Sequence, residues 1–195
     1  MELYQNALIT VNSMLQKRGY DTSNISKDED KITSIIELKY IQDTDLIFWE
    51  NKKQKYIFVK FIMDNSIKPT NIRDLLNNLA HSELLNVIII VKKKPNNTIL
   101  KLIKDYSHIQ LEFFWIYNLQ KDITEHKYVP KHVLLTQEEI SIMKQNYNIK
   151  SNYDLPVMLK NDPVSKFYGF KKGDICKIIR KSHSVGESIY YRIVK

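Results

Sequence analysis

The chain has 195 residues, of which 43% are hydrophobic and 27% are charged, a composition typical of globular proteins with one large or two small domains. The longest apolar run, residues 87–91, is much shorter than the roughly 18 residues that a membrane-spanning helix needs. The first residues lack the basic segment of a signal peptide, so we expect neither feature. A single cysteine, Cys176, excludes an internal disulfide and a cysteine-rich zinc site.

The chain carries 30 basic and 22 acidic residues, a formal net charge of +8. This excess is unevenly distributed, because residues 126–195 hold 13 basic and 6 acidic residues, whereas residues 1–125 hold 17 and 16. Such a division predicts two parts with different roles. Positive charge is compatible with a polyanionic partner but does not require one.

Residues 1–120 predict helices alternating with strands. Apolar residues recur at helical spacing over residues 3–18, and Gly19 is a suitable stop. Ser26 and Glu29 match a capping box, which favours a short second helix in the polar segment 21–43. Residues 44–49 and 56–62 then form a predicted β-hairpin around a polar turn.

The next elements predict a helix-covered sheet. Thr70 is a candidate cap for a helix with an apolar face, formed by Ile72, Leu75, Leu76 and Leu79. Residues 87–91 are apolar on both faces of an extended chain, which predicts a central strand covered on both sides. A loop at 92–97, a helix over 99–106 and a strand over 109–113 follow, so the first part is of the α/β class.

After Asp122 the pattern changes to that of a small α+β domain. Residues 129–135 are extended, and Thr136 with Glu139 predicts a capping box on a helix that ends near residues 146–148. Pro156 and Pro163 are expected in the first turns of short helices.

Glycines organise the end of the chain. Gly169 and Gly173 are expected to bracket a tight turn with positive φ angles. Residues 175–180 and 189–194 are expected to pair as strands around Gly186.

The second part also carries short motifs in a characteristic order. They are His126-Lys127-Tyr128-Val129-Pro130-Lys131-His132, Asp162-Pro163-Val164, Tyr168-Gly169-Phe170-Lys171-Lys172-Gly173-Asp174, Lys177-Ile178-Ile179-Arg180-Lys181-Ser182 and Tyr191-Arg192-Ile193-Val194. Over nearly all of residues 124–195 they closely resemble the shared fifth-largest subunit of eukaryotic nuclear RNA polymerases and its archaeal counterpart. The sequence departs from the family at His183-Ser184, where a Glu-Thr pair is usual.

The first part resembles the eukaryotic subunit more loosely, at residues 56–61, 87–91 and 122–126. The archaeal counterpart lacks this region. The resemblance implies a jaw domain, residues 1–123, with a restriction-endonuclease-like sheet flanked by helices, and a small α+β assembly domain, residues 124–195. The loose match and the composition, rich in Lys, Ile and Asn, fit either a divergent cellular copy or a copy from a large DNA virus.

The resemblance implies a non-catalytic subunit of a multisubunit DNA-directed RNA polymerase. Its C-terminal domain would dock on the largest subunit, and its jaw would contact downstream duplex DNA during transcription. We expect no cofactor, no membrane and no small-molecule substrate. The location would be the nucleus for a cellular protein, or the host cytoplasm and virion for a viral one.

Two groups of residues are candidates for these contacts. The DNA-contacting group is Lys92, Lys93, Lys94, Asn96 and Asn97. The alternative is that these residues form a solvated loop that contacts no DNA. The subunit-docking group is Pro130, His132, Asp162, Pro163, Gly169, Lys171, Gly173, Arg180, Tyr191 and Arg192. Of its cations, Arg180 and Arg192, with Lys181, are expected to pair with acidic or carbonyl groups of a partner. A second basic cluster at residues 52–55 is expected to be a solvated hairpin turn.

A nuclease of the same fold would need an acid followed by a (D/E)-x-K triplet on the next strand, to bind a metal ion and orient water. Here Asp45 precedes the strand, and Phe58-Val59-Lys60 takes the place of the triplet. Phe58 cannot bind Mg²⁺, so we expect Phe58 in the core, Lys60 pointing outward and no nuclease activity.

The histidines offer no clear metal site. His126 and His132 are expected to share one face of an extended segment, without further ligands. A free-standing duplex-DNA-binding transcription factor is the alternative to a polymerase subunit. Co-purification with polymerase distinguishes the two.

Overall fold

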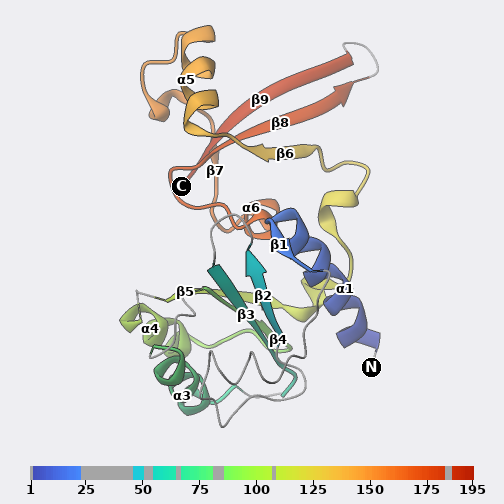
Figure 1. Cartoon of the computed structure of the whole chain (residues 1–195), viewed down its shortest axis with the longest axis vertical. Helices are drawn as coiled ribbons and strands as arrows, with labels where there is room; N and C mark the ends of the chain where they lie inside the picture. Colours follow the sequence, from blue (N-terminus) through green and yellow to red (C-terminus); the bar gives the residue numbers. More distant parts are fainter. Residues whose placement is uncertain are drawn as a thin grey trace. The chain divides into compact units, whose positions relative to one another are not determined.

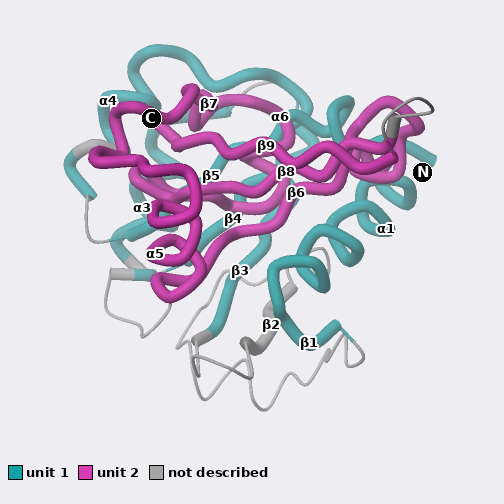
Figure 2. The backbone as a smooth tube through the Cα atoms, turned by 90° about the horizontal axis from the view of Figure 1, so that it is seen from above, with its two compact units in different colours: residues 1–121 teal, residues 122–195 magenta. Residues whose placement is uncertain are grey.

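The computed structural model describes residues 2–22, 46–50, 55–64, 67–80, 86–106, 109–182 and 186–195. The chain forms two compact units, Met1–Lys121 and Asp122–Lys195, hereafter the N-terminal and C-terminal units (Figure 2). The helix expected from Ser26 and Glu29, the acid Asp45 and the turn at residues 51–54 lie outside the described residues.

The N-terminal unit is built on a five-stranded sheet in the order β1-β2-β3-β4-β5 (Figure 1). Its strands are β1 Tyr20–Asp21, β2 Leu46–Glu50, β3 Lys55–Ile62, β4 Asn86–Val91 and β5 Gln110–Trp115. The first three pair antiparallel, whereas β3, β4 and β5 pair in parallel. The predicted hairpin and the predicted central strand are therefore confirmed.

Helices cover this sheet, as the apolar pattern of β4 requires. The helices are α1 Glu2–Lys17, α3 Pro69–Ala80 and α4 Asn97–Asp105. Apolar residues of α3 and α4 pack against Phe58, Val87 and Ile89, while Tyr4 of α1 contacts the ring of Phe61 edge-on at 4.7 Å. Alternate residues of β3 and β4 thus pack against different helices, which explains why residues 87–91 are all buried.

The structure confirms the predicted end of α1 but not the predicted cap of α3. Gly19 follows α1 at φ +92° and donates its N–H to the carbonyl of Gln16, as a helix stop should. Thr70, however, is the second residue of α3 rather than its cap. The helix begins at Pro69, whose fixed φ suits the first helical position.

A short 3-10 helix, η1 Ile116–Leu119, continues from β5 and contacts α1. Gln120 holds this end of the unit together, because its Nε2 donates to the carbonyls of Ile116 (2.8 Å) and Leu3 (3.1 Å). Asn6 of α1 donates to the side-chain oxygen of Gln120 at 3.4 Å.

The C-terminal unit has a four-stranded sheet in the order β6-β8-β9-β7 (Figure 1). Its elements are η2 Ile123–Glu125, β6 Lys131–Leu134, α5 Gln137–Asn146, η3 Asn152–Asp154, β7 Val157–Met158, α6 Pro163–Tyr168, β8 Ile175–Ser182 and β9 Gly186–Val194. β8 is antiparallel to β6 and to β9, and β7 is parallel to β9.

Two apolar clusters form the core of this unit. Met143 of α5 packs with Leu135, Leu155 and the strand residues Ile175 and Ile193. The second cluster is formed by Met158, Phe170, Cys176, Ile178 and Val194, with Val164 and Tyr168 of α6 against it. Since residues 175 and 176 alternate between the clusters, the sheet has a core on each face.

The caps of the C-terminal unit follow the sequence closely. The expected capping box is complete, because Glu139 N–H donates to Thr136 Oγ1 and Thr136 N–H donates to Glu139 Oε2. Asp162 accepts from two backbone N–H groups at the start of α6, and Gly169 ends that helix at φ +67°.

Pro156 was expected in a helix, and that prediction is wrong. The residue precedes β7, and its carbonyl accepts the N–H of Ile193 at 2.9 Å. Proline is tolerated at the start of an edge strand because no ladder bond is lost there, so pairing with β9 decides the conformation.

No helix among the described residues is long and apolar enough to cross a bilayer.

Candidate interaction surfaces

The lysine loop, residues 92–96, connects the central strand β4 to α4. Lys93 and Lys94 are exposed and Lys92 is half-buried. The backbone of Lys92 is held on both sides, since its N–H donates to Ile62 O at 3.3 Å and its carbonyl accepts from Trp115 Nε1 at 2.8 Å. The loop is therefore anchored to β3 and to the end of β5.

Trp115 also contacts a lysine side chain of this loop. The Nζ atom of Lys94 lies 5.0 Å from the Trp115 ring centroid, within cation–π range. Tyr117 packs on the same indole at 4.9 Å and is itself exposed. No sequence motif identifies Trp115 as part of this surface, because only the parallel pairing of β4 with β5 brings it opposite Val91.

The two asparagines of the candidate DNA-contacting group begin α4. Asn96 accepts the N–H of Ile99 at 3.0 Å, so it caps the helix, and the exposed Asn97 is the first helical residue rather than part of a loop. The first turn of α4 contains no acidic residue. A positive helix end thus adjoins three lysines, which favours a nearby anion.

Phe58 and Val59, the first two residues of the nuclease-like triplet, are buried in the core. Phe58 is 1% exposed and packs with α3 and α4, as expected. Lys60 was expected to point outward but is half-buried on the same face of β3 as Phe58. Nowhere in the described parts of the chain do three His, Cys, Asp or Glu residues gather as metal ligands would.

The two histidines of the first motif do not share a strand. The chain turns at His126, whose carbonyl accepts the N–H of Val129, and becomes a strand only at Lys131. The expected common face is therefore wrong. His132 Nδ1 lies 2.7 Å from the carbonyl of Pro130, so the neutral ring can donate to it.

Burial shifts the pKa of two side chains in the C-terminal unit. Desolvation lowers the pKa of His132, while the Pro130 carbonyl and Asp162 oppose the shift. Burial raises the pKa of the Cys176 thiol to about 11, so this core cysteine stays protonated and poorly nucleophilic.

The candidate docking residues divide into two kinds. Asp162, Pro163 and Gly169 begin and end α6, and Gly173 lies at φ +91° in the turn before β8, so these four have roles within the unit. The exposed cations of the group are Lys171, Arg180 and Arg192. Tyr191 is half-buried, with its ring 5.5 Å from that of Tyr147.

Exposed apolar side chains are a second surface feature that sequence motifs did not reveal. Tyr128 and Tyr153 are each 80% exposed, and Leu159 is 67% exposed. Lys195 Nζ lies 5.1 Å from the Tyr153 ring centroid. Hydrophobic periodicity predicts that large apolar residues lie in the core, so only the folded chain identifies those that remain exposed.

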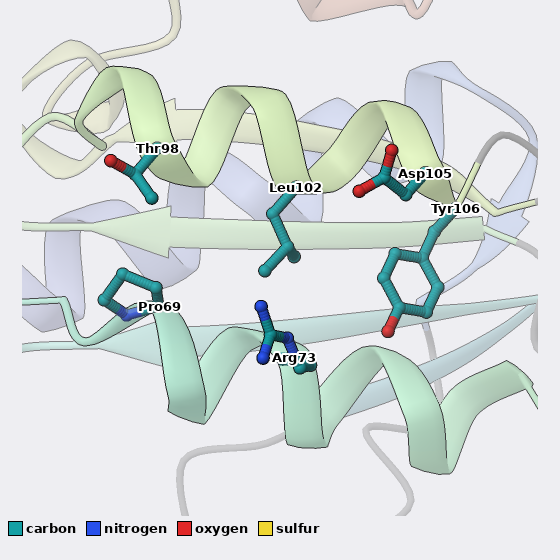
Figure 3. Close-up of a pocket in the computed structure, with 6 residues that line it drawn as sticks. All are labelled: Pro69, Arg73, Thr98, Leu102, Asp105 and Tyr106. Atoms are coloured by element: carbon teal, nitrogen blue, oxygen red, sulfur yellow. The ribbon is translucent and has the colours of Figure 1, made fainter.

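A cleft of ≈ 500 Å³ lies between α3 and α4 in the N-terminal unit (Figure 3). Its lining residues are Pro69, Arg73, Thr98, Leu102, Asp105 and Tyr106. The guanidinium of Arg73 points toward Leu102, and Tyr106 Oη donates to Asn77 Oδ1 on α3. The lining includes the cation of Arg73, the carboxylate of Asp105 and the apolar side chain of Leu102. This mixture favours no single class of ligand.

Comparison with known proteins identifies the family. Residues 121–194 match the family described as RNA polymerase Rpb5, C-terminal domain. The chain is 31% identical over 152 residues to the DNA-directed RNA polymerases I, II, and III subunit RPABC1 of Caenorhabditis briggsae, covering 77% of this chain and 72% of the relative. The same values hold for the Caenorhabditis elegans protein. The chain belongs to the Rpb5 family of RNA polymerase subunits.

A third relative matches this chain over a similar length. The rpabc1 subunit of Dictyostelium discoideum is 32% identical over 140 residues, which cover 70% of this chain and 71% of the relative. These alignments are longer than the C-terminal unit, so they include part of the N-terminal unit. The resemblance to a non-catalytic, eukaryotic-type polymerase subunit is confirmed.

Proposed function

We propose that this Rpb5-family chain is a structural subunit with two contacts. The C-terminal unit docks on the largest polymerase subunit, and the N-terminal unit acts as a jaw whose lysine loop contacts phosphates of downstream duplex DNA. The location follows the polymerase, in the nucleus if the protein is cellular, or in the host cytoplasm and virion if it is viral.

The observation that carries the DNA contact is the anchored lysine loop. The loop has two exposed lysines and one half-buried lysine, and hydrogen bonds to Ile62 and Trp115 fix the backbone of Lys92. The N-terminal end of α4 follows the loop directly. Lysine neutralises phosphate without demanding a fixed geometry, which suits a duplex that moves past the protein. Such contacts position the DNA and carry no sequence information.

The docking proposal rests on the family match and on the surface of the C-terminal unit. Exposed cations and exposed apolar side chains occur together in this unit, as at interfaces between subunits. The restriction-endonuclease-like description of the jaw is likewise proposed from the parallel strands β3, β4 and β5 with helices on the sheet. Phe58 in the core fits a jaw without nuclease chemistry.

A triple alanine substitution at Lys92, Lys93 and Lys94 tests the DNA contact. Polymerase containing the variant should assemble normally but hold long downstream duplex less tightly at low salt. For each phosphate that the variant no longer binds, the slope of log affinity against log salt should fall by about 0.9. Lifetimes of elongation complexes with long and short downstream arms measure the effect.

The matched control removes three exposed lysines elsewhere, Lys121, Lys150 and Lys160. This control loses the same charge, so it separates a local contact from a general effect of charge. Equal lifetimes for the lysine-loop variant and wild type on the long arm would show that the loop is only solvated. Failure of the unsubstituted chain to co-purify with polymerase would instead favour a free-standing DNA-binding factor.

A further inference from the structure

One edge of β9 is left without a neighbouring strand. The parallel partner β7 pairs only with Ile193 and Val194, although β9 begins at Gly186. Figure 1 shows β7 near the C-terminal end of β9 and not along the rest of the strand. Within the described chain, no strand pairs with residues 186–192 on this side.

The hydrogen-bond pattern of β9 identifies the groups at the open edge. The N–H of Ile193 points to the β7 side, since it donates to Pro156 O, whereas the N–H of Val194 donates to Asp174 O on the β8 side, both at 2.9 Å. Directions alternate along a strand, so the N–H groups of Glu187, Ile189 and Tyr191 face the open edge. Those of Ser188, Tyr190 and Arg192 face β8 and are bonded within the hairpin.

The side chains around this edge favour association. Ile189 is 43% exposed and Tyr190 is 52% exposed, and they lie on opposite faces of the strand. An open edge with exposed apolar side chains is a template for another strand, and proteins normally cover or blunt it. No proline blunts β9, and its only carboxylate is that of Glu187.

The charge of the hairpin indicates what kind of strand could pair with this open edge. β8 and β9 carry the cations Lys177, Arg180, Lys181 and Arg192. Against one carboxylate, this excess favours a partner segment that carries acidic residues. A second copy of this hairpin would bring the same positive charges together and is disfavoured.

From these observations we infer that β9 receives an extended segment of another polymerase subunit, with acidic and apolar side chains, as an added strand along residues 187–191. This inference rests on the proposed role as a polymerase subunit and specifies how the C-terminal unit docks. Backbone hydrogen bonds provide the affinity, and Ile189 and Tyr190 contact apolar side chains of the segment.

Amide hydrogen exchange tests the inference at single residues. Polymerase is purified through a tag on another subunit, exchanged in D₂O, and dissociated, and the amides of this chain are then compared with those of the isolated protein. Exchange at Glu187, Ile189 and Tyr191 should slow by about tenfold or more on assembly, because strand pairing protects amides. Ser188, Tyr190 and Arg192 serve as internal controls, since their amides are already bonded in the isolated hairpin.

Two variants of Ile189 provide a second readout. Ile189→Pro removes an N–H from the open edge, whereas the control Ile189→Val keeps this N–H and a β-branched apolar side chain and changes no charge. The N–H of Ile189 takes no part in the β8–β9 ladder, so both variants should fold. Incorporation into polymerase should fall at least severalfold for Ile189→Pro and stay near the wild-type level for Ile189→Val.

Each other outcome overturns the inference. Unchanged exchange at residues 187, 189 and 191 in a polymerase that contains the chain would refute the added strand while leaving the subunit role intact. Protection that appears in the isolated protein as its concentration rises would identify a second copy as the occupant. Absence of the chain from polymerase would refute both this inference and the proposed function.

Discussion

The imidazole of His132 is partly buried, which favours its neutral form. Desolvation is the largest influence and lowers its pKa from 6.5, while the positive charge of Arg192 acts in the same direction. The Pro130 carbonyl, 2.7 Å from Nδ1, and the carboxylate of Asp162 act in the opposite direction. Protonation of the ring is therefore easier in the unfolded chain than in the folded one.

This difference predicts a loss of stability in mild acid. Above the unfolded pKa both states are neutral at His132, so the ring has no effect on the pH dependence. As the pH falls through 6.5, the unfolded state binds a proton first, and the free energy of unfolding decreases until the lowered folded pKa is passed. His132→Gln should remove this part of the pH dependence in urea titrations. Parallel curves for variant and wild type across this interval would contradict the prediction.

Glycine is needed at position 173 because of the backbone conformation and not because a side chain would lack room. It adopts φ +91°, as expected from the sequence, and its N–H donates to Val194 O at 2.9 Å, while an added Cβ would meet nothing within 4 Å. Gly173→Val should reduce the free energy of unfolding by about 1–3 kcal/mol through backbone strain alone. Gly173→Asn is the control and should cost less, because asparagine tolerates positive φ better. Equal costs in urea unfolding would mean that strain is not the cause.

At the scale of elements, an ion pair connects the end of α1 to β5, the strand at the opposite edge of the sheet from β1. The guanidinium of Arg18, after the last residue of α1, donates to both oxygens of Glu112 on β5, at 3.0 and 2.9 Å. The Arg18 side chain is 7% exposed and that of Glu112 is 34% exposed. Arg18 also lies 5.9 Å from the centroid of the Phe114 ring. This geometry fixes the helix against the sheet more firmly than a surface pair would.

Substitution of this pair should therefore be coupled. Arg18→Met should reduce the free energy of unfolding by about 1–3 kcal/mol, because a charged hydrogen-bond partner is removed from a partly buried place. In combination with Glu112→Gln, the double variant should lose less than the sum of the two single losses. Additive losses in chemical denaturation would show that the two side chains do not stabilise each other.

At the scale of the whole molecule, the two units should be separable. The C-terminal unit has its own sheet, two apolar clusters and complete helix caps. A fragment of residues 122–195 should therefore unfold cooperatively by itself and enter polymerase, although a chain of this size is only marginally stable. A fragment of residues 2–121 should fold without being incorporated. If the N-terminal fragment assembles and the C-terminal one does not, the assignment of docking is reversed.

The sequence by itself predicted features that depend on neighbouring residues. The capping box at Thr136 and Glu139, the cap at Asp162 and the positive φ of Gly169 and Gly173 are confirmed. So are the buried central strand and the two hairpins, because hydrophobic periodicity reports burial directly. The family was also recognisable from the sequence, and its motifs contain the Asp162 cap and the glycines Gly169 and Gly173.

Other features were decided only when distant segments met in the folded chain. Pro156 is extended because Ile193 donates to its carbonyl, and Trp115 anchors the lysine loop because β5 lies beside β4. The open edge of β9 exists because β7 is only two residues long and pairs at one end. Hydrogen bonds within a turn are encoded by nearby side chains, whereas contacts across a sheet depend on register and topology, which no local pattern contains.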